Sequence, residues 1–177
     1  MKKFELTSET KINIFGKKLF RIKALISFGV VKTGETGGWV EKEENVNQSG
    51  NAWVFDNAEV SGNAEVSGNA RVSGDARVSG DAEVFGNARV SGNAEVFGNA
   101  EVSGNADYTT IHGFGTQFRT TTFFRCKNKQ VKVSCGCFYG TIPEFREQVK
   151  NTRKGKIAEE YLMIADLMEK HFAEEAK

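Results

Sequence analysis

The side chains best suited to binding a ligand lie together near residue 120, after the repetitive middle of the chain. In an extended segment over 118–125, alternation places four of them on one side: Arg119, Thr121, Phe123 and Arg125. Guanidinium groups and a hydroxyl donate hydrogen bonds to phosphate oxygens, and a phenyl ring stacks on a nucleobase. We therefore expect this side to bind an anionic nucleotide-type molecule. The alternative is a solvated strand face without a ligand.

Three further residues join this predicted ligand-binding set. His112 and Phe114 fall in the glycine-rich segment 112–116, which we expect to be a loop whose backbone N–H groups donate to an anion. Trp39 follows two glycines at the entrance to the repetitive region. Its ring either plugs the first turn of that region or offers a platform for a planar ligand.

Catalytic and metal-binding chemistry have less support in the sequence. A histidine is the usual general base near neutral pH, and the chain has 2 histidines, His112 and His171. Neither lies between residues 51 and 107, so we expect no enzyme activity; a lone base at His112 is the alternative. Four zinc ligands could come from His112 and the three cysteines, Cys126, Cys135 and Cys137. The spacing of these cysteines lacks the paired arrangement that is usual in zinc sites. We expect free thiols, no metal and no cofactor.

Composition narrows the partners and the compartment. The chain of 177 residues carries 24 basic and 23 acidic side chains, so its bulk charge favours neither a nucleic-acid duplex nor a membrane. No stretch approaches the ~20 apolar residues of a membrane span, and residues 1–7 lack the apolar core of a signal peptide. An odd number of cysteines in one short stretch suits a reducing compartment. We expect a cytoplasmic protein.

Residues 51–107 repeat the six-residue phrase Asn-Ala-x-Val-x-Gly, as in 63–68 and 69–74. The alanine and the valine are two positions apart, so they share the inward side of an extended segment. The glycine and the following asparagine tolerate positive φ and suit a corner. Three such units close a triangular coil of 18 residues, and stacked coils bury a continuous core. The repeat predicts a mainly β, parallel solenoid.

Outward residues 18 positions apart lie above one another on the coil, about 4.8 Å apart. The resulting columns are Trp53, Arg71, Arg89 and Asp107; Glu59, Arg77 and Glu95; and Glu65, Glu83 and Glu101. The second column cancels its own charge, whereas the third is wholly acidic. We expect the acidic column of one subunit to meet the arginine column of the next in a cyclic homo-oligomer. Exposed phenylalanines would add packing points at Phe55, Phe85 and Phe97. The alternative is a solvated acidic face.

These repeats resemble the hexapeptide-repeat family, in which an aliphatic residue is followed four positions later by a small one, as in Val66 and Ala70. The resemblance implies a left-handed parallel β-helix, a homotrimer and, as one alternative, an acyltransferase-like enzyme. The motifs at 37–40, 121–125 and 135–138 also resemble uncharacterised phage and prophage hexapeptide proteins. With that origin, we expect a non-enzymatic protein of the host cytoplasm that sequesters a nucleotide signal of host immunity. A rigid scaffold without a small ligand is the alternative.

The two ends of the chain differ from the repeat and define three predicted domains. Residues 1–39 alternate apolar and polar side chains and predict an N-terminal β cap, and residues 40–111 form the coil. Residues 112–177 predict an α+β module, in which a β-hairpin over 117–134 precedes two helices. A capping box at 141–144 opens the first helix, and an apolar stripe from Ile157 to Phe172 marks the second.

Overall fold

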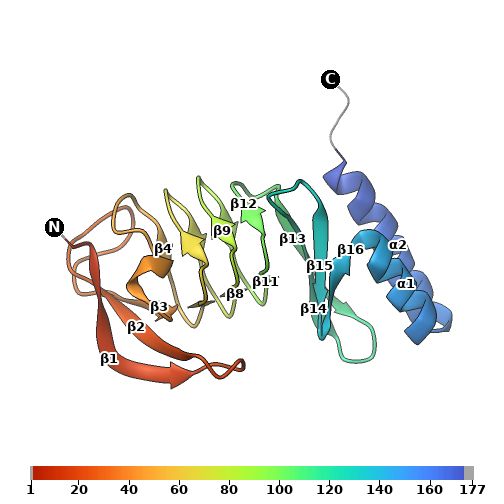
Figure 1. The fold of residues 1–177 in the computed structure, drawn as a ribbon, viewed down its shortest axis with the longest axis horizontal. Coiled ribbons are helices and arrows are strands. Elements are labelled where there is room, and N and C mark those ends of the chain that lie inside the picture. Colours follow the sequence, from red (N-terminus) through yellow and green to blue (C-terminus); the bar gives the residue numbers. More distant parts are fainter. Residues whose placement is uncertain (1, 174–177) are drawn as a thin grey trace.

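The computed structural model describes residues 2–173. It is mainly β, and its parts follow one another along the long axis as an N-terminal cap, a stack of coils, a sheet and a pair of helices (Figure 1). The cap consists of β1 (Phe4–Ile12), β2 (Lys18–Ala24) and β3 (Thr36–Val40), paired antiparallel in that order. A short 3₁₀ helix, η1 (Glu43–Asn45), leads into the coils.

The coil stack is built from two-residue strands, one for each six-residue phrase. They are β4 (Trp53–Val54), β5 (Glu59–Val60), β6 (Glu65–Val66), β7 (Arg71–Val72), β8 (Arg77–Val78), β9 (Glu83–Val84), β10 (Arg89–Val90), β11 (Glu95–Val96) and β12 (Glu101–Val102). They pair in parallel along three sides, in the orders β3-β5-β8-β11, β4-β7-β10 and β6-β9-β12. The predicted parallel solenoid is therefore confirmed.

Main-chain hydrogen bonds join each coil to the next. The N–H of Glu65 donates to the carbonyl of Ala82 at 2.9 Å, and similar bonds recur along every side. The repeat alanines from Ala52 to Ala100 and valines from Val54 to Val102 are buried in one continuous core. At the corners, Gly80 has φ +73°, and a Cβ there would lie 2.8 Å from the nitrogen of Gly98. Glycine is needed at this position because coils stack backbone against backbone.

Asparagines at one corner form a ladder along the stack. The side-chain amide of Asn51 donates to Asn69 at 2.9 Å, and that of Asn69 donates to Asn87 at 3.1 Å. Each amide is both donor and acceptor, so identical side chains one coil apart satisfy one another. At the other two corners Asp75 and Asp81 accept from Asn57 and Asn63, so an asparagine in the coil before is the donor at all three corners.

The N-terminal cap covers the first coil. It buries Trp53, which was expected to face outward in the arginine column. Trp53 occupies the outward position of the arginine column, yet its side chain is fully buried. Phe4 and Phe28 pack edge-on against its ring, with centroids 5.8 and 5.3 Å away. The segment between β2 and β3 folds over this side of the first coil, which a column of positions 18 residues apart does not anticipate.

Beyond the coils, four strands form an antiparallel sheet in chain order: β13 (Tyr108–Phe114), β14 (Arg119–Arg125), β15 (Val131–Cys135) and β16 (Phe138–Thr141). The helices α1 (Ile142–Thr152) and α2 (Gly155–Phe172) follow (Figure 1). Thr141 caps α1 through the predicted capping box with Glu144. The hairpin and both helices are confirmed, but residues 112–114 belong to β13 rather than to a loop. Over residues 2–173 no helix has the length and apolarity to cross a membrane.

A buried lysine closes the open end of the first coil. The Lys3 side chain is nearly inaccessible, and its ammonium donates to the carbonyl of Ala52 at 2.9 Å. It also lies 4.9 Å from the ring centroid of Phe28. Burial lowers the pKa of Lys3 from 10.5 to about 8, because the charged form loses its hydration. Lys3 thus satisfies a backbone acceptor that has no neighbouring coil, at a cost in solvation.

This burial predicts an increase in stability at alkaline pH. Between about pH 8 and 10.5 the unfolded chain holds the Lys3 proton while the folded chain has released it, so the free energy of unfolding rises with pH. The rise should reach about 2–3 kcal/mol. Urea unfolding of the wild type and Lys3→Met would measure this contribution as the difference between their two pH profiles, because the raised pKa values of Cys126 and Tyr139 lower the stability of both proteins over the same range. Lys2→Met, at an exposed neighbour, should keep it; identical profiles for wild type and Lys3→Met would contradict the assignment.

Candidate binding site

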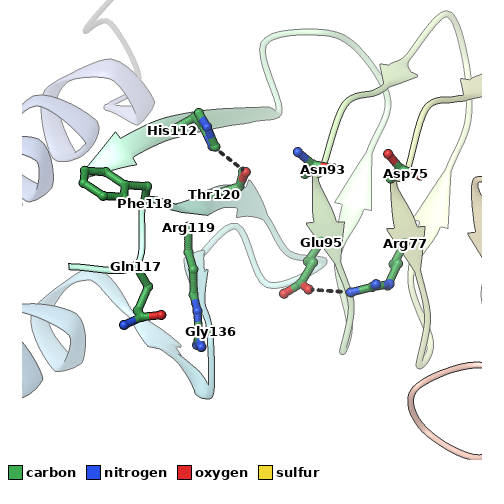
Figure 2. A pocket seen from close by; sticks show the side chains of 10 residues that line it. All are labelled: Asp75, Arg77, Asn93, Glu95, His112, Gln117, Phe118, Arg119, Thr120 and Gly136. Carbon is green, nitrogen blue, oxygen red and sulfur yellow. Dashed lines mark hydrogen bonds and ion pairs between the residues drawn. The ribbon is translucent and has the colours of Figure 1, made fainter. Parts of the chain in front are cut away.

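A groove of about 320 Å³ lies where the coil stack meets the C-terminal sheet. Figure 2 shows coil residues on one side and sheet residues on the other. The coil contributes Asp75, Arg77, Asn93 and Glu95, and the sheet and its turns contribute His112, Gln117, Phe118, Arg119, Thr120 and Gly136. The groove exists because β13 and β14 are longer than the two-residue sides of the coil and extend past its corner.

Arg119 is the free cation of this groove. It begins β14, is exposed, and makes no ion pair with any carboxylate of residues 2–173. Its side chain runs toward Gly136 (Figure 2), where a Cβ would lie 2.6 Å from the guanidinium nitrogen Nη1. The preceding Phe118 has φ +49° and is 64% exposed. Both side chains line the groove, but they leave the chain in different directions: Arg119 runs toward Gly136, and the Phe118 ring points away from the coil (Figure 2).

On the coil side, Arg77 and Glu95 form a fixed pair. Nη1 of Arg77 lies 3.1 Å from Oε1 of Glu95, and the hydroxyl of Ser134 donates to Oε2 at 2.9 Å. The N–H of Glu95 donates to the hydroxyl of Thr122 at 3.0 Å. The pair is about one-third exposed, so it adds little to stability. Its effect is to hold the Glu95 carboxylate in one position against the sheet.

His112 reaches the groove from β13. Its Nδ1 lies 3.2 Å from the hydroxyl of Thr120 on the neighbouring strand, as Figure 2 shows. The ring is exposed, and a hydroxyl rather than a carboxylate orients it. His112 can therefore donate to a ligand or accept from one, depending on its tautomer.

The predicted four-residue face on β14 is not an open surface. Thr121 and Phe123 are buried, and Phe123 packs edge-on against Phe145 of α1 at 6.1 Å. Arg125 lies 3.6 Å from Asp107 and donates to the carbonyl of Phe172 at 2.9 Å, so it fastens α2 to the sheet. The helices cover this side of β14. Of the four residues, Arg119 alone remains open to a ligand.

Two other predicted ligand-binding residues are also engaged in packing. Phe114 is partly buried against the core beneath the helices. Trp39 is 7% exposed, and its ring lies between Lys11 and Arg21, whose charged groups are 4.6 and 4.9 Å from the centroid. Trp39 pairs with the outward Glu59 while Val40 joins the core, so the Trp39 ring is covered by two cations on the outside of the first coil and is not an open platform. His112 and Arg119 are the predicted ligand residues that the fold brings together.

The predicted interface columns stack as expected. Glu83 is paired with Glu65 on one side and Glu101 on the other, and Arg71 is paired with Arg89. Lys127 binds Glu83 at 2.7 Å and so offsets part of the acidic column within the chain.

The three phenylalanines predicted at the interface differ in environment. Phe97 packs against Tyr139 at 4.5 Å. Phe55 is partly buried against the core, and Phe85 is half-buried. Phe97 is therefore already engaged within the chain.

The cysteines lie in three different environments. Cys126 is buried, Cys135 accepts a hydrogen bond from Thr121 at 3.2 Å, and Cys137 is exposed. Burial raises the pKa of Cys126, which disfavours its thiolate. Among residues 2–173 no three His, Cys, Asp or Glu side chains cluster in a way that could hold a metal ion.

Sequence reasoning missed the coil half of the groove. In the sequence, Arg77 and Glu95 stood out only as members of a column that cancels its own charge, and Asp75 did not stand out. No protein-family model matches the chain, and no curated protein matches it. The function therefore has to follow from the geometry of the groove.

The contrast between the exposed Arg119 and the buried Phe123 predicts unequal effects of their substitutions on stability. Phe123→Ala removes a fully buried ring and should lower the free energy of unfolding by about 3–5 kcal/mol. Arg119→Ala removes an exposed, unpaired side chain and should change it by less than about 0.5 kcal/mol. Chemical denaturation of both variants measures the difference. Equal losses would mean that Arg119 is part of the packing rather than of a binding surface.

Proposed function

We propose that this protein is a non-enzymatic binding protein that holds a small anionic, nucleotide-type molecule in the groove between coil and sheet. The observation that carries the proposal is Arg119, an exposed guanidinium that lines the groove without a carboxylate partner in residues 2–173, and Phe118, which precedes it, is also exposed and lines the groove. His112 adds a polar ring on the neighbouring strand. A guanidinium can hold phosphate oxygens in a bidentate manner, and an aromatic ring can stack on a base.

The charges of the groove favour binding of an anion at Arg119. Arg77 is neutralised by Glu95, which leaves Arg119 and Asp75 as the charges that a ligand meets. Asp75 sits at a coil corner and accepts from the amide of Asn57 at 3.4 Å. It opposes an anion, so it should limit the affinity that Arg119 provides.

Binding is favoured over catalysis by the surroundings of His112. A histidine that acts as a general base is normally oriented by a third group, most often a carboxylate. Within residues 2–173, His112 has the hydroxyl of Thr120 as its hydrogen-bond partner. This arrangement suits a ligand contact better than proton abstraction for acyl transfer.

The resemblance to phage hexapeptide proteins supports a more specific version of the proposal. In that version the ligand is a nucleotide signal of host immunity, and the protein lowers its free concentration in the host cytoplasm by binding it without chemical change. Sequestration requires stoichiometric binding and no turnover, which fits a groove whose histidine is oriented by a hydroxyl rather than by a carboxylate.

Titration calorimetry against cyclic dinucleotides and ADP-ribose tests this proposal. Arg119→Ala should weaken binding about tenfold or more, because a charge-assisted hydrogen bond is lost. Asp75→Asn should strengthen it about two- to fivefold by removing a repulsive charge. Asparagine already occupies the same corner position in neighbouring units, so this variant keeps the fold.

Arg153→Ala is the matched control, since this exposed arginine at the end of α1 lies outside the groove. No heat with any of these ligands, or a loss of affinity in Asp75→Asn, would contradict an anionic ligand. A ligand that returns unmodified in full amount after incubation would support sequestration over catalysis.

A second candidate function, assembly into a rigid homo-oligomeric scaffold, is favoured by the arginine column. Arg71 and Arg89 stack directly and have no ion-pair partner within residues 2–173. Like charges on neighbouring strands repel, so a complementary surface would stabilise them. The column of Glu65, Glu83 and Glu101 on another side of the coil offers such a surface, and we propose a cyclic assembly, with a trimer favoured.

Charge reversal tests this assembly. Arg71→Glu/Arg89→Glu should convert the oligomer to monomer in sedimentation, because two acidic columns would then face each other. Lys150→Glu, on an exposed turn of α1, provides a charge-reversal control that should keep the mass of the wild type. An unchanged mass in the double variant would exclude this interface.

A further inference from the structure

A second, larger hollow of about 580 Å³ lies next to the groove. One wall is the tip of the β1–β2 hairpin, with Ile14 and Phe15. A second wall is the coil corner that follows β5 and β8, where Gly62 and Gly80 lie. The third wall is the turn between β15 and β16 with Tyr139. Its volume is within the range of small-molecule sites.

The walls of this hollow are apolar although they face solvent. Ile14, Phe15 and Tyr139 are 67%, 64% and 39% exposed. Phe97 extends the apolar surface, since its ring lies 4.5 Å from that of Tyr139. Large apolar side chains from distant parts of a chain rarely meet around an open space unless something covers them.

The hollow is built rather than incidental. Lys17, in the turn of the hairpin, lies 3.0 Å from Glu41, and Glu41 accepts the N–H of Gly62 on the coil corner at 2.7 Å. These contacts lower the pKa of Glu41, with the Gly62 bond contributing most. Opposite, the hydroxyl of Tyr139 lies over Gly98 so closely that any side chain there would clash. Both walls are therefore held in place by specific contacts.

The apolar hollow and the polar groove are continuous. Glu95 and Gly136 line both of them. The Glu95 carboxylate, held by Arg77 and Ser134, thus stands at the junction with lone pairs available to an amino N–H donor. On one side of it lies the unpaired Arg119, and on the other side lie aromatic and aliphatic surfaces.

We propose that the hollow is the base subsite of the same ligand, so that the protein binds a nucleotide with its phosphates at Arg119 and its base between Phe15 and Tyr139. The inference rests on the proposed function. Phosphate alone would need only the groove. A nucleobase would cover the apolar walls and donate a hydrogen bond from its exocyclic amino group to Glu95. The β1–β2 hairpin is then part of the binding site, although it is far from β14 in sequence.

Calorimetry with adenosine 5′-diphosphate, guanosine 5′-diphosphate and pyrophosphate tests the two subsites separately. A nucleoside diphosphate should bind about fivefold or more tightly than pyrophosphate, because the base contributes its own contacts. Phe15→Ser should remove this advantage and leave pyrophosphate binding unchanged. Ile12→Ser is the matched control, since Ile12 is 65% exposed on the same hairpin but does not line the hollow.

Alkylation of Cys137 gives a second measurement at the site itself. This exposed thiol lines the hollow, so saturating nucleoside diphosphate should slow its reaction with N-ethylmaleimide, and pyrophosphate should not. Peptide mass mapping follows the reaction, and Cys137→Ser identifies the signal. Equal rates with and without nucleoside diphosphate would overturn the base subsite.

The remaining outcomes separate the two proposals. If pyrophosphate binds through Arg119 but nucleoside diphosphates bind no more tightly, the base subsite fails and the anion-binding function stands. If none of the probes binds saturably, both fail. If Phe15→Ser changes the sedimentation mass but not nucleotide affinity, the hollow is a contact between copies and the inference is overturned.

Discussion

The ladder of main-chain hydrogen bonds between successive coils is the interaction on which the rest of this structure depends. Each coil satisfies its own backbone only through its neighbours, so the first and last coils present unpaired groups. At the first coil Lys3 donates to Ala52, and the side-chain amide of Asn45 donates to the carbonyls of Gly62 and Ala64. At the last coil the hydroxyl of Thr122 accepts from the N–H of Glu95. Residues on both sides of the coil stack thus supply hydrogen-bond partners for backbone groups of the terminal coils.

The two candidate subsites result from the way these ends are joined to the stack. A side of the coil is two residues of strand, whereas β1 has nine and β14 has seven. The excess length extends past the coil corner at both ends, and the overhanging parts bring Phe15 and Arg119 to the same side of the solenoid. A regular stack with few variable positions thus acquires a concave surface without interrupting its repeat.

The coil could be predicted from the sequence, whereas the candidate site could not, for a physical reason. Alanine and valine at a strict period of six have one arrangement that buries them all, and a capping box marks a helix start locally. The alternation along β14 predicts a sheet with one buried face and one solvent-exposed face. Both faces of this sheet are covered, because Phe124 packs against the coil core and Phe123 packs against the helices. Residues 112–114 continue β13 through a register shift to the pair of Phe114 with Arg119, which local glycine content cannot reveal. Phe15, Arg77 and Arg119 approach the concave surface from three distant segments, so no local pattern joins them.

The hairpin tip and the C-terminal sheet face each other across a stack whose height grows by one coil at a time. Each 18-residue insertion would add about 4.8 Å to that separation, and each deletion would subtract as much. The number of repeats therefore sets the distance between the two end domains. Gain or loss of a whole coil would keep both end domains and change only the width of the concave surface between them.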